Sequence, residues 1–532
     1  MFITISQKKD ESEEIEYNSC VAKNVLPETK GDPSASGEGA STNRLVICEE
    51  NMENGMKDLP AGKRVFFVGI GGISMSGLAR IARNYGLIVG GSDMHPSERT
   101  HELETIGIEV FGAHSEENLI SFKPDIVVHT AAILPGNPEL KYAKENGITV
   151  MERSVFLGLI TKNFRNVINV SGTHGKTTTT SMVSLILLAS GLNPTVHLGA
   201  ELDAFAGSVH LGSKDQLLVS EACEYHRSFL EFYSTIAAIT NIDYDHVDCY
   251  KSIDEVIDVF AQFSEKISAD GNLVIPAGDK NVAESVKRMP AIREKLGLPM
   301  PHITTTGLAG EGVETYGREP DFAADNITYT DGKAGFDVLF KGRPYAHIQL
   351  AIPGKHNVYN ALTAIACASL AGGTKEAAQR ALSEFTGAEG RFTIKGKFQG
   401  AMIVTDYAHH PSAARATLDA ASHVPHNKTW VVFQPLTYSR TKVLFEDYVT
   451  SLLPCESVFF DEIFSDREVN PGDISSKDIA DEINRRGGHA EFFESKDAIV
   501  EKLRSCVKEN DMILILGPED IRALGDRLAA ME

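Results

Sequence analysis

The segment NVSGTHGKTTTT, residues 169–180, spaces glycines, a lysine and threonines in a way that suits phosphate chemistry. The common nucleotide signature G-x-x-x-x-G-K-[ST] would put its first glycine where this chain has Val170. Gly172 gives a tighter G-x-x-G-K-T pattern instead. A strand, a glycine turn and a helix gather backbone amides and the helix dipole at one point, which suits an anion. We therefore predict that ATP is bound by Gly172, Thr173, His174, Gly175, Lys176, Thr177 and Thr178.

Two further segments supply groups that a metal–nucleotide site needs. Glu221 follows the apolar run LLVS, and Asp245 and His246 follow AAITNI. Ligands of open α/β sheets bind outside the carboxyl ends of the strands, so both segments are expected to face the glycine loop. The Thr177 hydroxyl and the Glu221 carboxylate are hard oxygen ligands that suit Mg²⁺. A lone histidine after a strand is more often a structural hydrogen-bonding group, and the residues alone favour that interpretation of His246.

A pair of asparagines stands at the start of a predicted helix in GKHNVYNALTAIA. Asn357 and Asn360 are three residues apart and therefore share one helix face. They could hydrogen-bond a nucleotide base, or they could cap the helix. The residues alone favour capping.

The segment GIGGISMSGLA resembles a weak dinucleotide fingerprint. Its glycines at the start of a helix form a sensible cradle for a pyrophosphate. Together with an acidic residue at the end of the next strand, this turn fits NAD or a sugar-nucleotide diphosphate equally well. The candidate residues are Gly69, Gly71, Gly72, Ser74 and Asp93.

A third group of polar residues lies at strand ends near the carboxyl terminus, in VTDYAHHPSAARATL, FQPLTYSRT and AEGRFTIKG. An arginine at such a position can pair bidentately with a carboxylate or phosphate. Their clustering makes these residues candidates for binding. They are Arg391, Asp406, Tyr407, His409, His410, Tyr438 and Arg440.

The composition is that of an ordinary globular chain, with 42% hydrophobic and 23% charged residues among 532. A formal charge of −22 argues against broad nucleic-acid binding, which needs a basic footprint. No apolar run reaches the roughly 18 residues that a membrane helix needs, and no secretory signal precedes the first strand. The seven scattered cysteines fit reduced thiols. We expect a cytoplasmic protein without stable membrane insertion; the oligomeric state is left open.

Strands alternating with helices predict an α/β fold with doubly wound parallel sheets. The expected order is a disordered acidic and polar tail (1–60), a Rossmann-like domain (61–163), a central P-loop ATPase α/β domain (164–388) and a Rossmann-like C-terminal domain (389–532). Within the central domain, HITTTG, NITYT and the segment 334–354 are expected to form short antiparallel strands.

Together these motifs resemble the Mur ligase family, the ATP-dependent amino-acid ligases of peptidoglycan synthesis. The resemblance rests on GTHGKTTTT, TNIDYDHVD, GKHNVYNALTA, GRF and DYAHHP, and covers roughly residues 62–520. The family's loop has the form G-T-x-G-K-T, which accounts for the displaced first glycine. Within the family, VGIGGISMSGLA with DYAHHP most resembles members that join L-alanine to UDP-N-acetylmuramate. The nearest alternatives are members that attach a recycled tripeptide, and a non-catalytic nucleotide-binding relative.

The resemblance implies a reaction in which ATP phosphorylates the lactyl carboxylate of UDP-N-acetylmuramate and L-alanine attacks the acyl phosphate. It makes Lys176, His410 and Arg440 catalytic and adds His246 to Thr177 and Glu221 as a Mg²⁺ ligand. It places Asn357, Asn360, Arg391 and Asp406 around ATP, and Tyr407, His409, His410, Tyr438 and Arg440 near the amino acid. The UDP-sugar would meet Gly69, Gly71, Gly72, Ser74, Asp93 and His246. Leu436 departs from the family, which commonly has a histidine there.

Overall fold

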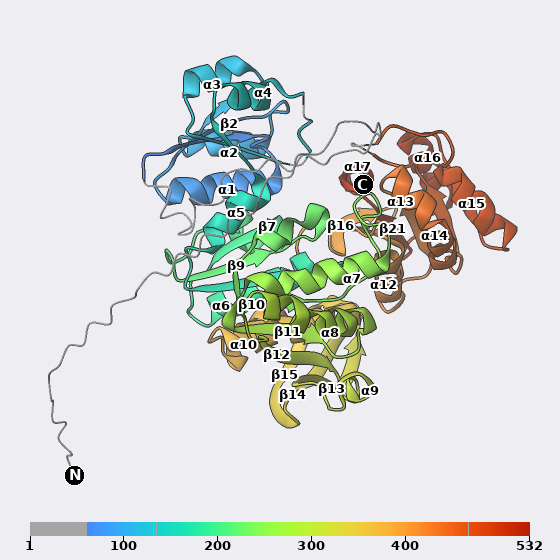
Figure 1. The fold of residues 1–532 in the computed structure, drawn as a ribbon. Helices are drawn as coiled ribbons and strands as arrows, with labels where there is room; N and C mark the ends of the chain where they lie inside the picture. The colour runs from blue at the N-terminus through green and yellow to red at the C-terminus, as the bar shows by residue number, and fades with distance from the viewer. Residues whose placement is uncertain (1–60, 131, 135, 466–467) are drawn as a thin grey trace, which may run out of the picture. The chain divides into compact units, whose positions relative to one another are not determined.

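The computed structural model describes residues 61–130, 132–134, 136–465 and 468–532, in which three β-sheets follow one another along the chain (Figure 1). In Figure 1 the first sheet is drawn in blue to cyan, the second in green to yellow and the third in orange to red. The predicted α/β fold class is confirmed. The predicted tail, residues 1–60, lies outside the described residues. None of the helices in the described ranges has the length and apolar character needed to cross a membrane.

The first sheet contains five parallel strands in the order β3-β2-β1-β4-β5, the order of the nucleotide-binding half of a Rossmann fold. Its strands are β1 (Arg64–Val68), β2 (Ile88–Ser92), β3 (Glu109–Phe111), β4 (Ile126–His129) and β5 (Thr149–Glu152). Its helices are α1 (Ile73–Asn84), α2 (Glu98–Thr105), α3 (Glu116–Phe122), α4 (Pro138–Glu145) and α5 (Arg153–Thr161). The apolar residues of α1 recur at helical spacing and are buried, which explains why this segment forms an amphipathic helix.

The second sheet contains ten strands in the order β15-β14-β13-β12-β11-β10-β6-β9-β7-β8. They are β6 (Asn166–Ser171), β7 (Thr195–Leu202), β8 (Gly207–His210), β9 (Leu217–Glu221), β10 (Ser234–Ile239), β11 (Ile267–Pro276), β12 (His302–Leu308), β13 (Phe322–Thr330), β14 (Lys333–Phe340) and β15 (Arg343–Pro353). The helices are α6 (Lys176–Ala189), α7 (Ile253–Gln262), α8 (Lys280–Lys295), α9 (Val313–Tyr316), α10 (His356–Leu370) and α11 (Lys375–Glu384). The 3₁₀ segments are Asp203–Phe205, Tyr225–Glu231 and Phe263–Lys266.

The prediction of antiparallel strands was correct for β13, β14 and β15 but wrong for HITTTG. That segment forms β12, which pairs parallel to both β11 and β13. The reason is the connection: α8 crosses over between β11 and β12, so the chain re-enters the sheet in the same direction. The direction of a strand depends on this crossover and not on the composition of the strand.

The third sheet has six strands in the order β16-β17-β21-β18-β19-β20, parallel except for the β16–β17 pair. The strands are β16 (Thr393–Phe398), β17 (Ala401–Asp406), β18 (Thr429–Phe433), β19 (Val458–Phe460), β20 (Ala490–Phe492) and β21 (Met512–Leu516). The helices are α12 (Pro411–Ser422), α13 (Tyr438–Val443), α14 (Phe445–Leu452), α15 (Ser476–Arg485), α16 (Lys496–Cys506) and α17 (Glu519–Ala529). The predicted domain boundaries near residues 163 and 388 fall in the connections between sheets and stay predictions.

One close approach joins the first and second sheets. Gly77 lies on the buried face of α1, and a Cβ atom there would come within 2.5 Å of the Val209 side chain on β8. Glycine at this position therefore allows α1 to pack directly on the second sheet.

Candidate active site

A cleft of about 1000 Å³ is lined by residues that follow strands of the second and third sheets. This is the carboxyl-end edge at which α/β sheets bind ligands. Most of the predicted site residues meet here although they come from segments far apart in the sequence. The lining includes Thr173, His174, Gly175, Lys176, Thr177, Thr178, Glu221, His246, Asn357, Asn360, Arg391, Asp406, Tyr407, His409, His410 and Arg440.

The tight glycine loop joins β6 to α6, and two of its glycines are required by space and by backbone conformation. Gly172 has φ +134°, and a Cβ there would lie 2.0 Å from Thr240 Oγ1. Gly175 has φ +81°, and its Cβ would lie 2.4 Å from Asn360 Oδ1. L side chains rarely adopt such φ values, so both positions favour glycine. No side chain of the described residues caps α6, which leaves its N-terminus open to an anion.

Lys176, the first residue of α6, is held by groups around the loop. Its Nζ donates to the carbonyl oxygens of Gly172 (2.5 Å) and Thr173 (3.1 Å) and forms an ion pair with Glu224 (2.8 Å). Burial lowers the pKa of Lys176, but the charge and hydrogen bond of Glu224, together with Cys223 and Glu221, outweigh burial, and the net pKa lies above its ordinary value. The ammonium is therefore charged and positioned beside the helix N-terminus.

Glu224 was not predicted from the sequence. Its side chain is only 3% exposed, and it accepts both hydrogen bonds of an ion pair whose partner lies 48 residues earlier. Its position three residues after Glu221, past the end of β9, is the signal that could have identified it. At that edge of the sheet an acidic residue is expected to face the ligand.

The predicted metal ligands lie next to this ion pair. Thr177 Oγ1 donates to Glu221 Oε2 at 2.9 Å, and the Gly199 amide donates to the same oxygen at 2.9 Å. His246 Nε2 lies 3.7 Å from Glu224 Oε1. Burial lowers the pKa of His246, and its Nδ1 is buried without a hydrogen-bond partner among the described residues. A hydroxyl and two carboxylates are the oxygen donors that Mg²⁺ prefers, so this set of side chains fits the ion.

The capping interpretation of the two asparagines is wrong. The helix α10 begins at His356, its N-cap is Lys355, and no side chain there caps it. Asn357 Nδ2 donates back to the Pro353 carbonyl oxygen at 2.6 Å, and Asn360 Nδ2 donates to Asn357 Oδ1 at 3.0 Å. A cap must accept from the helix amides, whereas these amide groups donate to the preceding turn and to each other. Asn360 Oδ1 also accepts from Thr179 Oγ1 at 3.2 Å, which links α10 to α6, the helix that follows the glycine loop.

The segment after β17 brings the second group of predicted residues to the cleft. The amide of Phe392 donates to Asp406 Oδ2 at 2.8 Å, and the Arg391 guanidinium lies 5.2 Å from the centre of the Tyr407 ring. Burial raises the pKa of Asp406, with the charge of Arg391 opposing it. His409 is turned back onto the Tyr407 carbonyl oxygen at 2.9 Å, and burial holds its pKa well below the ordinary value.

Arg440 forms a buried ion pair with Asp245, from the loop after β10. Arg440 Nε lies 2.6 Å from Asp245 Oδ1, and the two side chains are only 2% and 7% exposed. Burial raises the pKa of Asp245, but the charge of Arg440 and the neighbouring histidines together outweigh burial, so the pKa lies well below its ordinary value. Arg440 also donates to the carbonyl oxygen of Leu436. Tyr438, at the start of α13, is not among the described residues that line the cleft.

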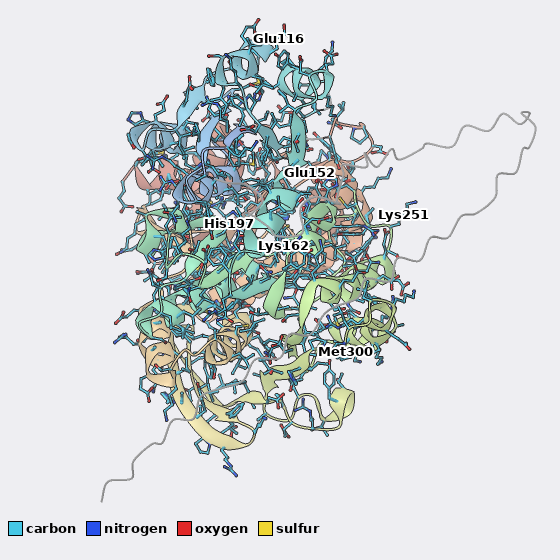
Figure 2. All side chains as sticks on the ribbon, turned by 60° about the vertical axis from the view of Figure 1, so that its left-hand side comes forward. Glu116, Glu152, Lys162, His197, Lys251 and Met300 are labelled. Carbon is cyan, nitrogen blue, oxygen red and sulfur yellow. The ribbon has the colours of Figure 1, made fainter. Side chains whose placement is uncertain are left out.

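The predicted UDP-sugar residues of the first sheet do not line the cleft. The Asp93 carboxylate accepts from the amides of Gly71 (2.9 Å) and His95 (3.0 Å) and so fixes the glycine turn. Ser74 Oγ lies 2.9 Å from Arg153 Nη1 and 3.0 Å from Nε2 of His197, a β7 residue labelled in Figure 2.

Arg99 and Arg153 were also missed by sequence reasoning. Arg99 lines the cleft, donates to the Gly71 carbonyl oxygen at 2.9 Å and pairs with Glu201 at 2.9 Å. Arg153 reaches Ser74 from the start of α5. Neither arginine stands in a motif, so only the fold brings them to the glycine turn.

Comparison with known proteins places most of the chain in one family. Three family models match in succession: the Mur ligase family, catalytic domain over residues 64–165, the Mur ligase middle domain over 170–368, and the Mur ligase, glutamate ligase domain over 390–518. The three matches correspond to the three sheets.

Curated and solved relatives agree with this assignment. The UDP-N-acetylmuramate–L-alanine ligase of Caldanaerobacter subterraneus is 41% identical over 88% of this chain and 98% of its own length. The crystal structure of the UDP-N-acetylmuramate–alanine ligase of Thermotoga maritima superimposes with a TM-score of 0.71, at 28% identity over 88% of this chain and 98% of that one. A murein peptide ligase from Psychrobacter arcticus gives a TM-score of 0.65, at 25% identity over 88% of this chain and 98% of that one. The chain therefore belongs to the Mur ligase family.

Proposed function

We propose that this chain joins L-alanine to the lactyl carboxylate of UDP-N-acetylmuramate, with cleavage of ATP to ADP and phosphate, as a step of peptidoglycan precursor synthesis in the cytoplasm. The observation that carries the proposal is the convergence on one cleft of the glycine loop, Lys176, the Thr177–Glu221 pair and the residues after β17. The full-length similarity to UDP-N-acetylmuramate–L-alanine ligases supports the same substrates.

In the proposed reaction, a carboxylate oxygen attacks the γ-phosphorus, the bond to the β-phosphate oxygen breaks, and ADP leaves. The amine of L-alanine then attacks the acyl phosphate, loses a proton, and expels phosphate as the amide forms. Mg²⁺ held by Thr177, Glu221 and His246 would neutralise charge on the phosphates. Lys176 offers a fixed positive charge beside the α6 N-terminus, where charge develops during phosphoryl transfer.

The remaining residues are proposed to orient the substrates. Asn357, Asn360, Arg391 and Asp406 would contact ATP. Tyr407, His409, His410 and Arg440 would contact the amino acid and the reacting carboxylate, and Tyr438, at the start of α13, is proposed for the same role although it lies outside the cleft lining. The first sheet, through its glycine turn and Ser74, would hold the UDP-sugar. Because the glycine turn and the loop after β6 belong to different sheets, a closing motion that excludes water is expected.

Leu436 bears on the identity of the amino acid. Leu436 lines the cleft and is 8% exposed, at a position where the resemblance to the family predicts a polar histidine. The side chain here is apolar, and a murein peptide ligase is among the similar solved structures. A tripeptide is therefore the second candidate for the amine substrate, in place of L-alanine.

The test is phosphate release by the purified full chain with ATP, Mg²⁺ and UDP-N-acetylmuramate, run with each of the twenty amino acids and with the tripeptide. We expect release that requires both UDP-N-acetylmuramate and L-alanine and that is lost in Lys176→Met. Lys287→Met, which removes an exposed lysine of α8, is the matched control and should leave the rate unchanged. ATP binding without release under any condition would support a non-catalytic relative instead.

A further inference from the structure

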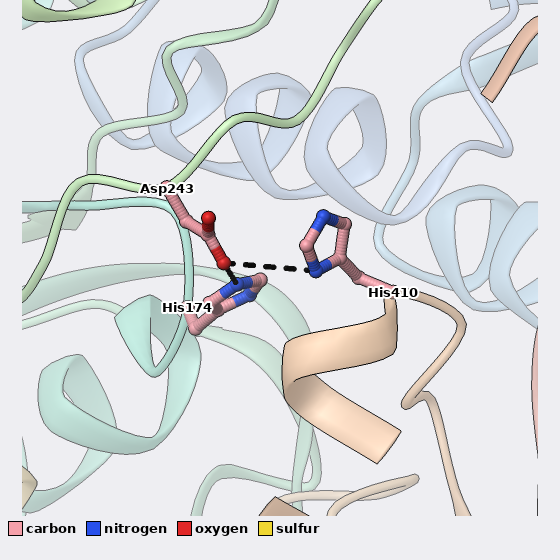
Figure 3. Close-up of side chains that lie close together, drawn as sticks. All are labelled: His174, Asp243 and His410. Carbon is pink, nitrogen blue, oxygen red and sulfur yellow. Dashed lines mark hydrogen bonds and ion pairs between the residues drawn. The ribbon is translucent and has the colours of Figure 1, made fainter. Parts of the chain in front are cut away.

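Two histidines and an aspartate from three separate segments meet beside the glycine loop (Figure 3). His174 lies in the loop itself, Asp243 follows β10, and His410 is the N-cap of α12. His174 Nε2 is 3.1 Å and His410 Nδ1 is 3.8 Å from the same oxygen, Asp243 Oδ2. One ligand atom from each residue lies within 4.8 Å of the other two.

The spacing of these atoms is close to that of a metal site. Zinc binds imidazole nitrogen and carboxylate oxygen at about 2.0–2.2 Å, so two ligands of a tetrahedral ion lie about 3.3 Å apart. The two distances to Asp243 Oδ2 fall on either side of this value. Bringing the histidine nitrogens to the same spacing requires a movement of at most about 1.5 Å.

The surroundings also orient the ligands. His410 Nε2 lies 3.2 Å from the Tyr244 carbonyl oxygen, which holds the proton on that nitrogen and leaves Nδ1 unprotonated, 3.8 Å from Asp243 Oδ2. Such a hydrogen bond from the second ring nitrogen typically accompanies a metal-binding histidine. In the structure, Nδ1 accepts from the Ser412 amide at 3.2 Å, a bond that an ion would replace. The His174 amide is fixed by Asn241 Oδ1 at 2.9 Å.

We propose that His174, Asp243 and His410 form a binding site for a divalent transition-metal ion of the Zn²⁺ or Co²⁺ type, separate from the Mg²⁺ site at Thr177 and Glu221. Two imidazoles and one carboxylate favour these borderline ions, whereas the proposed Mg²⁺ ligands Thr177, Glu221 and His246 offer one imidazole among oxygen donors. Transition-metal ions are therefore expected to prefer the site with two histidines, and Mg²⁺ the neighbouring oxygen-rich site. His174 and His410 line the cleft, which leaves a fourth coordination position accessible.

An ion bound here would tie the glycine loop to the start of α12. The loop precedes the second sheet's first helix, and α12 belongs to the third sheet, so the ion would restrict movement between them. Zn²⁺ is therefore expected to inhibit any turnover that needs this movement. The binding site itself does not depend on the proposed ligase reaction.

The experiment uses the full chain, freed of metal by a chelator, and titrates it with Co²⁺ in the presence of millimolar Mg²⁺. We expect one equivalent to bind with visible d–d bands and without the charge-transfer band of thiolate ligation. His174→Gln and Asp243→Asn should each weaken binding at least about tenfold. The control is His347→Gln, because His347 and Asp337 form an exposed pair at 2.8 Å on the β14–β15 hairpin.

Two results would overturn the proposal. The first is Co²⁺ binding that is equally tight in the unmodified chain, His174→Gln and Asp243→Asn. The second is the absence of d–d bands in the unmodified chain. Thermal melts of each variant in the absence of metal establish that it is folded, so that a loss of binding is assigned to the missing ligand.

Discussion

Removing either partner of the buried ion pair between Asp245 and Arg440 should strongly destabilise the protein. At 2.6 Å and an effective dielectric constant of about 20, the attraction is about 6 kcal/mol, most of it offset by desolvation of two nearly inaccessible groups. Removing one partner leaves the other buried without its counter-charge. We therefore expect Asp245→Asn or Arg440→Met to lower the free energy of unfolding by about 3–5 kcal/mol.

The double variant distinguishes this explanation from a simple loss of contacts. With both charges removed, the desolvation cost also disappears, so Asp245→Asn/Arg440→Met should be less destabilised than the sum of the single variants, by at least about 2 kcal/mol. Arg504→Met is the control, because Arg504 pairs with Glu501 on the surface of α16 and its loss should cause no resolvable change.

The chain provides its own probe for this measurement. Trp430 is the single tryptophan of the chain. It lies on β18, the strand of the third sheet that precedes α13, and its Nε1 donates to Asp511 Oδ2 at 2.9 Å. Urea unfolding followed by its fluorescence therefore reports on the region that contains Arg440. The reasoning is refuted if a single variant changes stability by less than about 1 kcal/mol, or if the effects of the two single variants simply add.

Three further predictions concern the glycine loop, the metal ligands and the buried histidines. Gly172→Ala should abolish measurable ATP binding in calorimetry and cost about 1–3 kcal/mol of stability, because its Cβ would overlap Thr240; Gly191→Ala, with φ +78° and open space around its Cβ, should keep ATP binding. Glu221→Gln should raise the Mg²⁺ concentration for half-maximal phosphate release at least about tenfold, whereas Thr177→Ser, which keeps the hydroxyl, should change it little; equal effects of the two would contradict the assignment. Burial lowers the pKa of both His197 and His410 to about 4, below the ordinary value of 6.5, so the unfolded chain binds more protons as pH falls from 6.5 to 4 and stability is lost in that window. Each histidine should lower the free energy of unfolding by about 2 kcal/mol between pH 7 and pH 5, measured by urea unfolding. In His197→Gln the part of this loss that His197 causes should disappear. An unchanged pH dependence in that variant would show that His197 is not neutral in the folded state.

The local sequence was sufficient to predict those helices and strands whose apolar pattern matches their burial in the structure. The run MILIL forms the fully buried β21, and the loop motif leads from a strand into α6, because apolar runs and glycine turns determine these elements through short-range interactions. The strand β16, TIKGKF, was not predicted, since its lysines and glycine do not resemble a buried strand and it is formed by antiparallel pairing with β17.

Long-range contacts explain the errors within the candidate site. The asparagines of α10 resemble a capping pair locally, but Asn360 meets Thr179, which lies 181 residues earlier. Glu224 belongs to the site because it pairs with Lys176, 48 residues earlier in the sequence. Asp243 belongs to it because it contacts His174, 69 residues earlier. Only the folded sheet brings such side chains together, so residue types and spacing identify the loop but not the partners of its lysine and histidine.

The central claim is that the carboxylate of UDP-N-acetylmuramate is activated by phosphoryl transfer in the cleft beside Lys176. It is tested most directly with UDP-N-acetylmuramate carrying ¹⁸O in both lactyl carboxylate oxygens, incubated with the full chain, ATP, Mg²⁺ and L-alanine. The account predicts that each released phosphate contains one ¹⁸O atom, because the acyl phosphate breaks at its carbonyl carbon. Phosphate without ¹⁸O, or ¹⁸O recovered in AMP, would contradict it.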